Sequence, residues 1–256
     1  MLTICDLALV RGKRTLLTGL NLDIAPGQCW LVLGENGCGK STLLATLAGW
    51  LKPASGSIAL AGKPLADWAA RERAVKMAWL PQGDETPFSI AVLAKTLTGR
   101  EPHLSRWDWE SAADIALARA QLARLDLAGF ETRDLVTLSG GERRRVALAT
   151  TLTQDADLLL LDEPLSQLDL CHQQQALQVL REESSRGKTL LLVGHDPNHA
   201  RGFASHALLL FGDGRWLAGP AGDVLTSEHL SALYRHPVRT IKDTSGPWFV
   251  PEPACG

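Results

Sequence analysis

The chain has 256 residues, of which 45% are hydrophobic and 21% charged, and its formal net charge is −2. This composition is ordinary for a folded protein with a large core. A nearly neutral chain argues against a nucleic-acid partner, because domains that bind nucleic acid are usually strongly basic. The longest apolar runs, residues 158–161 and 189–193, are far shorter than the roughly 20 residues that span a membrane. No secretory signal opens the chain, so we expect a cytoplasmic protein.

Apolar runs bounded by turn residues predict strands over four stretches of the first third: 2–10, 19–33, 58–60 and 75–80. The expected turns within and between the first two lie at Gly12, Gly19 and Pro26-Gly27. From residue 90 to about residue 127 the apolar spacing is helical, with an alanine-rich helix expected over 108–125.

The second half alternates between apolar strands and helices. Strands are expected at 157–162 and 190–193, and a helix at 170–186 with Gly187 just past its end. This alternation predicts an α/β core whose parallel sheet is covered on both faces. The core is interrupted by a helical insertion at about residues 86–155.

Two further elements are expected towards the C-terminus. Residues 207–211 and 215–218 read as a hairpin joined through Gly212-Asp213-Gly214. The tail after Pro237 is rich in Pro and Gly, and we expect it to pack loosely.

Residues 34–42, Gly-Glu-Asn-Gly-Cys-Gly-Lys-Ser-Thr, match a phosphate-binding loop, with an apolar strand before them and a helix after them. The glycines let the backbone wrap the phosphates, Lys40 is expected to reach the β and γ oxygens, and Ser41 to ligate Mg²⁺. Cys38 is read as a small side chain that fits the loop. A chance glycine-rich turn is the alternative, and the complete spacing with both flanks disfavours it.

Polar residues follow three of the predicted strands. Asp162 and Glu163 come directly after the run 158–161, where ligands bind in open α/β sheets, so Asp162 is expected to hold Mg²⁺ and Glu163 to polarise the attacking water. His195 follows the strand 190–193 and could contact the γ-phosphate or orient Glu163. Gln82 could reach the metal or the water. Ordinary strand-end side chains are the alternative for each, and it weakens when all stand beside a phosphate loop.

Residues 138–142, Leu-Ser-Gly-Gly-Glu, form a second phosphate-reading element. Ser139 and Glu142 have the spacing of a capping box, and Gly140 and Gly141 leave N–H groups uncovered at the positive end of the helix. Because residues 34–42 suffice for one nucleotide, these spare N–H groups are expected to reach the nucleotide of a neighbouring chain. The three following arginines, 143–145, are expected on a solvated or domain-bridging face.

Together these motifs resemble those of the nucleotide-binding subunit of ABC transporters. The matching motifs, in chain order, are the Walker A loop 34–42, the Q-loop Gln82, the signature 138–142, the Walker B residues Asp162 and Glu163, the D-loop 166–169 and the switch histidine His195.

The resemblance covers about residues 2–220 and implies a fold. The implied fold is α/β, a P-loop NTPase core with a mixed, largely parallel sheet, an N-terminal antiparallel β subdomain and an inserted α-helical subdomain. The implied organisation is one ATPase domain over residues 1–236, with the ATP-binding core at about 1–85 and 156–220, the helical subdomain at about 86–155, and a C-terminal tail at 237–256.

The resemblance also implies ATP and Mg²⁺ as cofactors, ATP hydrolysis, and a head-to-tail dimer with two nucleotides between the subunits. Within one chain the nucleotide would be held by Gly34, Glu35, Asn36, Gly37, Cys38, Gly39, Lys40, Ser41 and Thr42. The implied catalytic residues are Glu163, His195 and Gln82, and the implied metal ligands are Ser41, Gln82 and Asp162. The implied contributions to the partner's nucleotide are Ser139, Gly140 and Gly141 at the γ-phosphate and Asp169 as a link between the two sites.

One position departs from the family pattern. The family commonly places an aromatic residue near the end of the first strand to stack on adenine, whereas residues 9–12 here read Leu-Val-Arg-Gly. Arg11 could stack its guanidinium on the base, or adenine could be held weakly. The preference for ATP over GTP therefore stays open at this point.

A narrower resemblance, carried by residues 97–104 and 223–234, is to the ATPases of importers for iron-siderophores, haem and vitamin B12. It implies a peripheral subunit on the cytoplasmic face of the inner membrane, with transmembrane permease subunits, docked through residues 88–99, and a periplasmic binding protein as partners. An exporter ATPase for haem or lipoprotein is one alternative. A soluble ABC ATPase acting on DNA or ribosomes is another, although such proteins usually carry long coiled coils or two cassettes.

Overall fold

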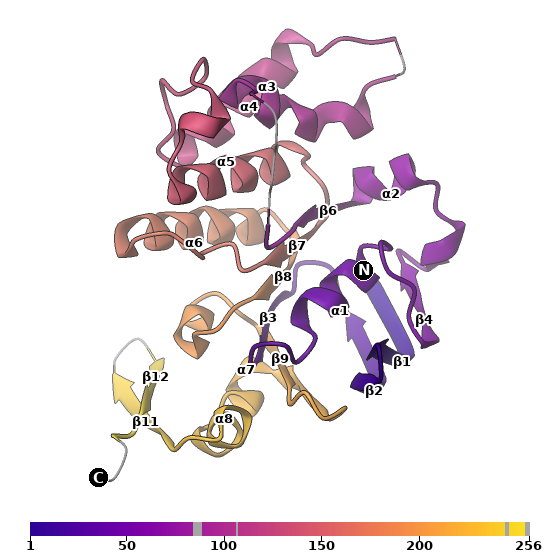
Figure 1. Ribbon diagram of the computed structural model, residues 1–256, viewed down its shortest axis with the longest axis vertical. Coiled ribbons are helices and arrows are strands. Elements are labelled where there is room, and N and C mark those ends of the chain that lie inside the picture. The colour runs from indigo at the N-terminus through magenta and orange to yellow at the C-terminus, as the bar shows by residue number, and fades with distance from the viewer. Residues whose placement is uncertain (84–88, 106, 244–245, 254–256) are drawn as a thin grey trace. The chain divides into compact units, whose positions relative to one another are not determined.

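A computed structural model describes residues 1–83, 89–105, 107–243 and 246–253 (Figure 1). The chain forms two compact units. The first unit combines Met1–Asp67 with Thr189–Gly256, and the second unit is Trp68–Lys188.

The first unit opens with an antiparallel sheet of strand order β2-β1-β4-β5. Its strands are β1 (Leu2–Arg11), β2 (Arg14–Ile24), β4 (Ser55–Leu60) and β5 (Lys63–Pro64). The predicted turns at Gly12 and Pro26-Gly27 are confirmed, since β1 and β2 end there. The prediction for Gly19 was wrong: it lies inside β2 with φ 62°, where the register against β1 shifts, so this glycine forms a bulge rather than a turn.

The parallel strands of the first unit start from β3 (Cys29–Gly34), which pairs in parallel with β8 (Thr189–Val193) and with β9 (His206–Leu210). Every residue of β3 and β8 is buried, as expected for strands covered on both faces. β10 (Trp216–Pro220) runs antiparallel to β9, so the predicted hairpin is present and the strands are mixed but mostly parallel.

The helices of the first unit are α1 (Lys40–Leu47), α7 (Ala221–Val224) and α8 (Ser227–Tyr234), with 3₁₀ turns η1 (Leu65–Asp67) and η4 (Pro197–Ala200). The expectation of a loosely packed tail was wrong. β11 (Val238–Asp243) and β12 (Gly246–Pro251) pair antiparallel, and Phe249 is 5% exposed. The Asn198 side chain binds both the N–H and the carbonyl of Phe249, at 2.9 and 3.0 Å, so this hairpin is anchored to the fold.

The second unit contains the parallel pair β6 (Met77–Leu80) and β7 (Leu158–Asp162). Its helices are α2 (Ala70–Lys76), α3 (Val92–Leu97), α4 (Ala112–Arg124), α5 (Gly140–Thr153) and α6 (Leu170–Ser185), with 3₁₀ segments η2 (Thr98–His103) and η3 (Leu135–Thr137).

Two predicted boundaries in this unit were displaced. Val75 and Lys76 end a helix instead of opening the strand, because pairing with the neighbouring strand begins only at Met77 opposite Leu158. The alanine-rich helix begins at residue 112 rather than 108, because Ser111 and Asp114 form a capping box that sets its first turn.

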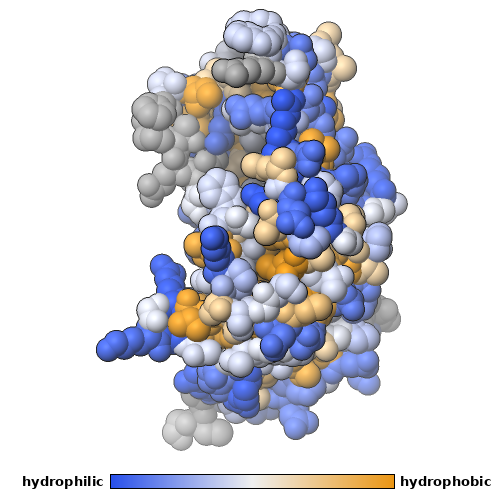
Figure 2. Space-filling view, turned by 90° about the vertical axis from the view of Figure 1, so that its right-hand side faces the viewer, coloured by the Kyte–Doolittle hydropathy of each residue, from blue (hydrophilic) through white to orange (hydrophobic). Residues whose placement is uncertain are grey.

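Helices α3, α4 and α5 of the predicted insertion pack against one another. They belong to the same unit as β6, β7 and α6, so the boundaries of a separate helical subdomain stay a prediction. Within the described ranges, no helix is both long enough and apolar enough to cross a lipid bilayer. The face drawn in Figure 2 is mainly hydrophilic, with hydrophobic residues in small separate patches.

Candidate nucleotide site

The phosphate-binding loop follows β3 and ends at the first turn of α1. Gly37 and Gly39 have φ values of 75° and 111°, which only glycine adopts without strain. A Cβ atom added to Gly34 would lie 2.5 Å from the Cys38 sulfur and 2.6 Å from the Leu210 carbonyl oxygen. The sequence requirement for glycine here therefore comes from close packing as well as from the turn.

Lys40 is 6% exposed and lies over this loop. Its ammonium group donates to the carbonyls of Gly34 at 2.7 Å and Glu35 at 3.1 Å. The buried Cys38 thiol has a pKa above its ordinary value, chiefly because burial disfavours the thiolate. Cys38 is thus a small buried side chain that fills space, as the sequence indicated, while the lysine and the wrapped backbone form a cradle suited to phosphate oxygens.

His195 reaches the same edge of the first unit as the phosphate loop. β8 pairs in parallel with β3, Val193 opposite Val32, and the Gly194 N–H donates to the Val32 carbonyl at 3.1 Å. The His195 side chain is exposed. Because the carboxyl ends of neighbouring parallel strands meet at one edge, this unit brings together the loop 34–42 and the predicted switch histidine.

The second unit brings Gln82 and the two acidic residues together in the same way. β6 pairs in parallel with β7, Leu80 opposite Leu161, so Gln82 and Asp162 follow neighbouring strand ends. Asp162 is 1% exposed, and Glu163 is half-buried. Glu163 has φ 50°, a left-handed conformation that costs an L-residue roughly 1–2 kcal/mol. The catalytic role of Glu163 stays a prediction.

Arg144 connects these strand ends to α5. Its guanidinium donates to the Pro81 carbonyl at 2.7 Å and also to the Asp162 carbonyl, and its side chain is buried. Arg145 is buried as well and donates to the Leu125 carbonyl at 2.8 Å. The solvated half of the prediction is therefore wrong for Arg144 and Arg145, which are buried. Arg144, which joins the predicted insertion to two strand ends of the predicted core, fits the domain-bridging alternative. A signal was present: residues 146–152 carry no charge, which is typical of a buried helix whose preceding cations must find acceptors inside the fold.

Replacing Arg144 by methionine should destabilise the protein by about 3 kcal/mol, because it leaves buried carbonyls of two strand ends without their donor. The measurement is the free energy of unfolding in a urea titration. The matched control is Arg119→Met on the exposed side of α4, which should change stability by less than about 0.5 kcal/mol. Equal stabilities of the two variants would show that Arg144 does not hold the strand ends together.

The predicted capping box of the signature segment is confirmed. The Glu142 N–H donates to the Ser139 hydroxyl at 3.2 Å, and the Ser139 N–H donates to the Glu142 carboxylate at 2.7 Å. The N–H and the hydroxyl of Ser139 hold the pKa of Glu142 below its ordinary value. The carboxylate therefore stays ionised at the positive end of α5, where negative charge is favourable.

Close packing is a second requirement for glycine at the two signature positions, and the sequence did not reveal it. A Cβ atom on Gly140 would lie 2.5 Å from Oε1 of Gln167, and one on Gly141 would lie 2.9 Å from the Gln167 carbonyl oxygen. Gln167 itself has φ 64°. The D-loop thus packs directly on the signature glycines of its own chain.

Asp169, the last residue of the D-loop, is the N-cap of α6. Its carboxylate accepts from the His172 N–H at 2.9 Å and from the His172 ring at 2.9 Å. These contacts, the backbone N–H first, lower the pKa of Asp169. The predicted role of Asp169 as a link between two nucleotide sites stays a prediction, and the structure adds a helix-capping role.

The region expected to hold adenine contains two arginines rather than one. Arg11 is exposed at the end of β1, and its stacking role stays a prediction. Arg14, which sequence reasoning missed and no local pattern singles out, donates to the Gly212 carbonyl at 3.0 Å. One of its guanidinium nitrogens lies 3.9 Å from the position a Cβ atom would take on Gly37, so Arg14 borders the phosphate loop.

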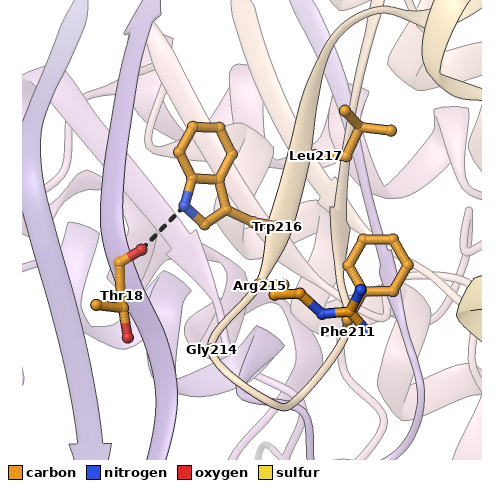
Figure 3. Close-up of a pocket in the computed structure, with 6 residues that line it drawn as sticks. All are labelled: Thr18, Phe211, Gly214, Arg215, Trp216 and Leu217. Carbon is orange, nitrogen blue, oxygen red and sulfur yellow. Dashed lines mark hydrogen bonds between the residues drawn. The ribbon is translucent and has the colours of Figure 1, made fainter.

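A pocket of about 470 Å³ also lies in the first unit (Figure 3). It is lined by Thr18, Phe211, Gly214, Arg215, Trp216 and Leu217. The Trp216 ring nitrogen donates to the Thr18 carbonyl at 3.0 Å, which fastens the β9–β10 hairpin to β2. None of the sequence-predicted site residues lines it, so this pocket is a feature of the hairpin and not of the phosphate loop.

Oxygen donors of the kind that Mg²⁺ prefers are present at the predicted metal ligands. They are the Ser41 hydroxyl in the first turn of α1, the Gln82 amide after β6 and the buried Asp162 carboxylate at the end of β7. Each of these three side chains therefore offers the oxygen chemistry of a magnesium ligand, and their common role stays a prediction.

Comparisons with known proteins agree with this geometry. The sequence model of the ABC transporter family matches residues 17–166. The hemin import ATP-binding protein HmuV of Gloeobacter violaceus is 43% identical over 239 residues, which cover 88% of this chain and 86% of that protein. The iron(3+)-hydroxamate import ATP-binding protein FhuC of Bacillus subtilis is 36% identical over 234 residues, 91% of this chain and 87% of that protein.

Among solved structures, a metal-chelate type ABC transporter in an inward-facing conformation matches with a TM-score of 0.84 at 30% identity, over 99% of this chain and 98% of that chain. The P-loop ATPase fold expected from the motifs is thereby confirmed, with its parallel strands, its antiparallel N-terminal sheet and its helices. The chain belongs to the ABC transporter family, as one of its ATP-binding subunits, which are ATPases.

Proposed function

We propose that this chain powers an importer that carries an iron chelate across the inner membrane, with haem as the first candidate cargo. The observation that carries the proposal is the 43% identity to a hemin import ATP-binding protein over 239 residues. The 36% identity to an iron(3+)-hydroxamate import protein makes a ferric hydroxamate the second candidate.

The proposed chemistry assigns a role to each motif. The loop 34–42 wraps the phosphates of ATP, with Lys40 neutralising their charge. Ser41, Gln82 and Asp162 would hold Mg²⁺, which would supply further charge neutralisation when bound. Glu163 accepts a proton from the attacking water.

The remaining roles concern the γ-phosphate and the partner chain. His195 donates a hydrogen bond to the γ-phosphate, and Ser139 with the N–H groups of Gly140 and Gly141 closes over the nucleotide of a partner chain. The Glu142 carboxylate accepts from the Ser139 N–H in the capping box. The N–H groups of Gly140 and Gly141 therefore stay available for phosphate at the positive end of α5.

The proposed assembly is a head-to-tail dimer on the cytoplasmic face of the membrane, bound to permease subunits and served by a periplasmic binding protein. Such a dimer explains why the chain has a second phosphate-reading segment, residues 138–142, in addition to a complete phosphate loop. The proposed permease contact at residues 88–99 includes Phe88, which lies outside the described residues, and α3, which packs against α5. ATP-driven closure of the dimer would move the permease between two states.

The test is transport itself. The affinity-tagged chain is purified from membranes with its bound partners, reconstituted in vesicles, and assayed for ATP-dependent movement of haem, a ferric hydroxamate and cobalamin. We expect haem uptake that stops when ATP is omitted. Uptake of the hydroxamate or of cobalamin alone would change the cargo, and movement in the opposite direction would favour the exporter alternative. Purification without any membrane partner would contradict the transport function.

A further inference from the structure

The backbone of His195 is held from two sides. The preceding residue, Gly194, donates its N–H to the Val32 carbonyl of β3 at 3.1 Å. On the other side, the hydroxyl of Tyr234, the last residue of α8, donates to the His195 carbonyl at 3.0 Å. The imidazole projects from a peptide whose orientation is thereby defined, although the side chain itself is exposed.

Tyr234 keeps its proton in this position. Burial raises the pKa of its phenol, and the nearby carboxylate of Asp196 acts in the same direction. A carbonyl oxygen has no hydrogen to donate, so the protonated phenol is the donor in this hydrogen bond. The contact is therefore maintained over the whole range of physiological pH.

The segment that follows His195 is tied to the C-terminal hairpin. Asn198 binds the N–H and the carbonyl of Phe249. The Arg201 guanidinium lies 3.9 Å from the centroid of the Trp248 ring and pairs with Asp243 at 2.8 Å. We call residues 195–201 the histidine loop. The hairpin of β11 and β12 contacts the end of this loop at Asn198 and Arg201, and Tyr234 contacts its start at His195.

The same end of α8 also reaches the phosphate loop. Arg235 directly follows Tyr234, ends α8 in a left-handed conformation with φ 51°, and pairs with Glu35 at 2.9 Å. Because the Arg235 side chain is 73% exposed, this ion pair contributes little on its own. It nevertheless places the C-terminus of α8 between the phosphate loop and the histidine loop.

We propose that Tyr234 is a positioning residue for ATP hydrolysis, which holds the backbone of His195 so that its imidazole meets the γ-phosphate. The C-terminal hairpin braces the other end of the same loop. This inference rests on the proposed function in one respect, the role of His195, and it is independent of the cargo. It gives the C-terminal segment a part in catalysis.

The test is a double-mutant cycle on the purified chain, with kcat and KM for ATP measured in four proteins: wild type, Tyr234→Phe, His195→Ala and the double variant. Tyr234→Phe removes only the hydroxyl, so we expect kcat to fall about five-fold, the weight of one hydrogen bond, with KM unchanged. In the His195→Ala background the same substitution should leave kcat unchanged, because a residue that acts through His195 has nothing left to position.

The matched control is Ser185→Ala. It removes another hydroxyl that donates to a backbone carbonyl, the 2.7 Å bond from Ser185 to Glu182 at the end of α6, outside the C-terminal hairpin and the nucleotide motifs, and should leave kcat at the wild-type value. A second readout uses the fact that Tyr234 is the only tyrosine among 256 residues. Chain labelled with 3-fluorotyrosine gives one ¹⁹F resonance, which we expect to shift when ATP and Mg²⁺ are added.

The outcomes separate this inference from the proposed function. Equal losses from Tyr234→Phe in both backgrounds, or an unchanged kcat in Tyr234→Phe when His195→Ala is impaired, would overturn the inference alone. A ¹⁹F resonance whose chemical shift does not change when ATP and Mg²⁺ are added would also overturn the inference. Wild-type kcat in His195→Ala would instead overturn the role of His195, and the inference with it.

Discussion

Replacing Glu163 by glutamine is expected to lower steady-state ATP hydrolysis by roughly 10²–10⁴-fold, the usual contribution of a general base. Glutamine has the same size and adopts the left-handed backbone of residue 163 at a similar cost, so the fold should be unaffected. Its amide cannot accept the proton of the attacking water. ATP should bind with nearly unchanged affinity and stay uncleaved between two subunits.

Two measurements check this result. Phosphate release gives the hydrolysis rate, and size-exclusion chromatography with light scattering should detect a dimer when the variant is incubated with ATP. Glu110→Gln, at an exposed position before α4, is the matched control and should behave as the wild type. Hydrolysis at the wild-type rate in Glu163→Gln would remove Glu163 from the role of base.

Replacing Ser139 by alanine is expected to lower hydrolysis by about 10–100-fold, the weight of a hydrogen bond to a charged group, while ATP affinity of the isolated chain stays the same. The reason is that the hydroxyl and the neighbouring N–H groups are proposed to contact the nucleotide of the partner. The substitution also removes a helix cap and should cost about 1 kcal/mol of stability.

The chain provides a control for that stability loss. Ser111 caps α4 with the same capping box that Ser139 forms at α5. Ser111→Ala should therefore lose the same stability in urea titrations and keep full hydrolysis. If Ser139→Ala lost ATP binding as a monomer, measured by calorimetry, the signature would act within its own chain and the head-to-tail dimer would be wrong.

The parts of the site that the sequence predicted are local. The capping box at Ser139 and Glu142 needs only residues three apart, and the glycines at 37 and 39 need only a loop of defined backbone. The strand-end positions of Asp162 and His195 were predictable because continuous apolar runs identify buried parallel strands, whose carboxyl ends share an edge. Helix starts were less accurate, as the displaced beginning of α4 shows.

The errors on the arginines and on the C-terminal tail concern partners that are distant along the chain. Three consecutive arginines favour a solvated or domain-bridging face, and the sequence does not show that Arg144 and Arg145 are buried and donate to the carbonyls of Pro81 and Leu125. Likewise, the sequence predicted a loosely packed tail because Asn198, which anchors Phe249, lies 51 residues earlier in the chain.

The sequence by itself determined the family and the fold class and predicted the nucleotide motifs, because those depend on spacing, periodicity and local backbone requirements. Only the tertiary structure decided which side chains hold the motifs in place: Arg144 at two strand ends, Gln167 on the signature glycines, and Tyr234 on the histidine loop. The physical reason is that a hydrogen bond between distant residues depends on how elements pack. A donor and a carbonyl acceptor leave no pattern in the sequence, since every residue carries the same carbonyl.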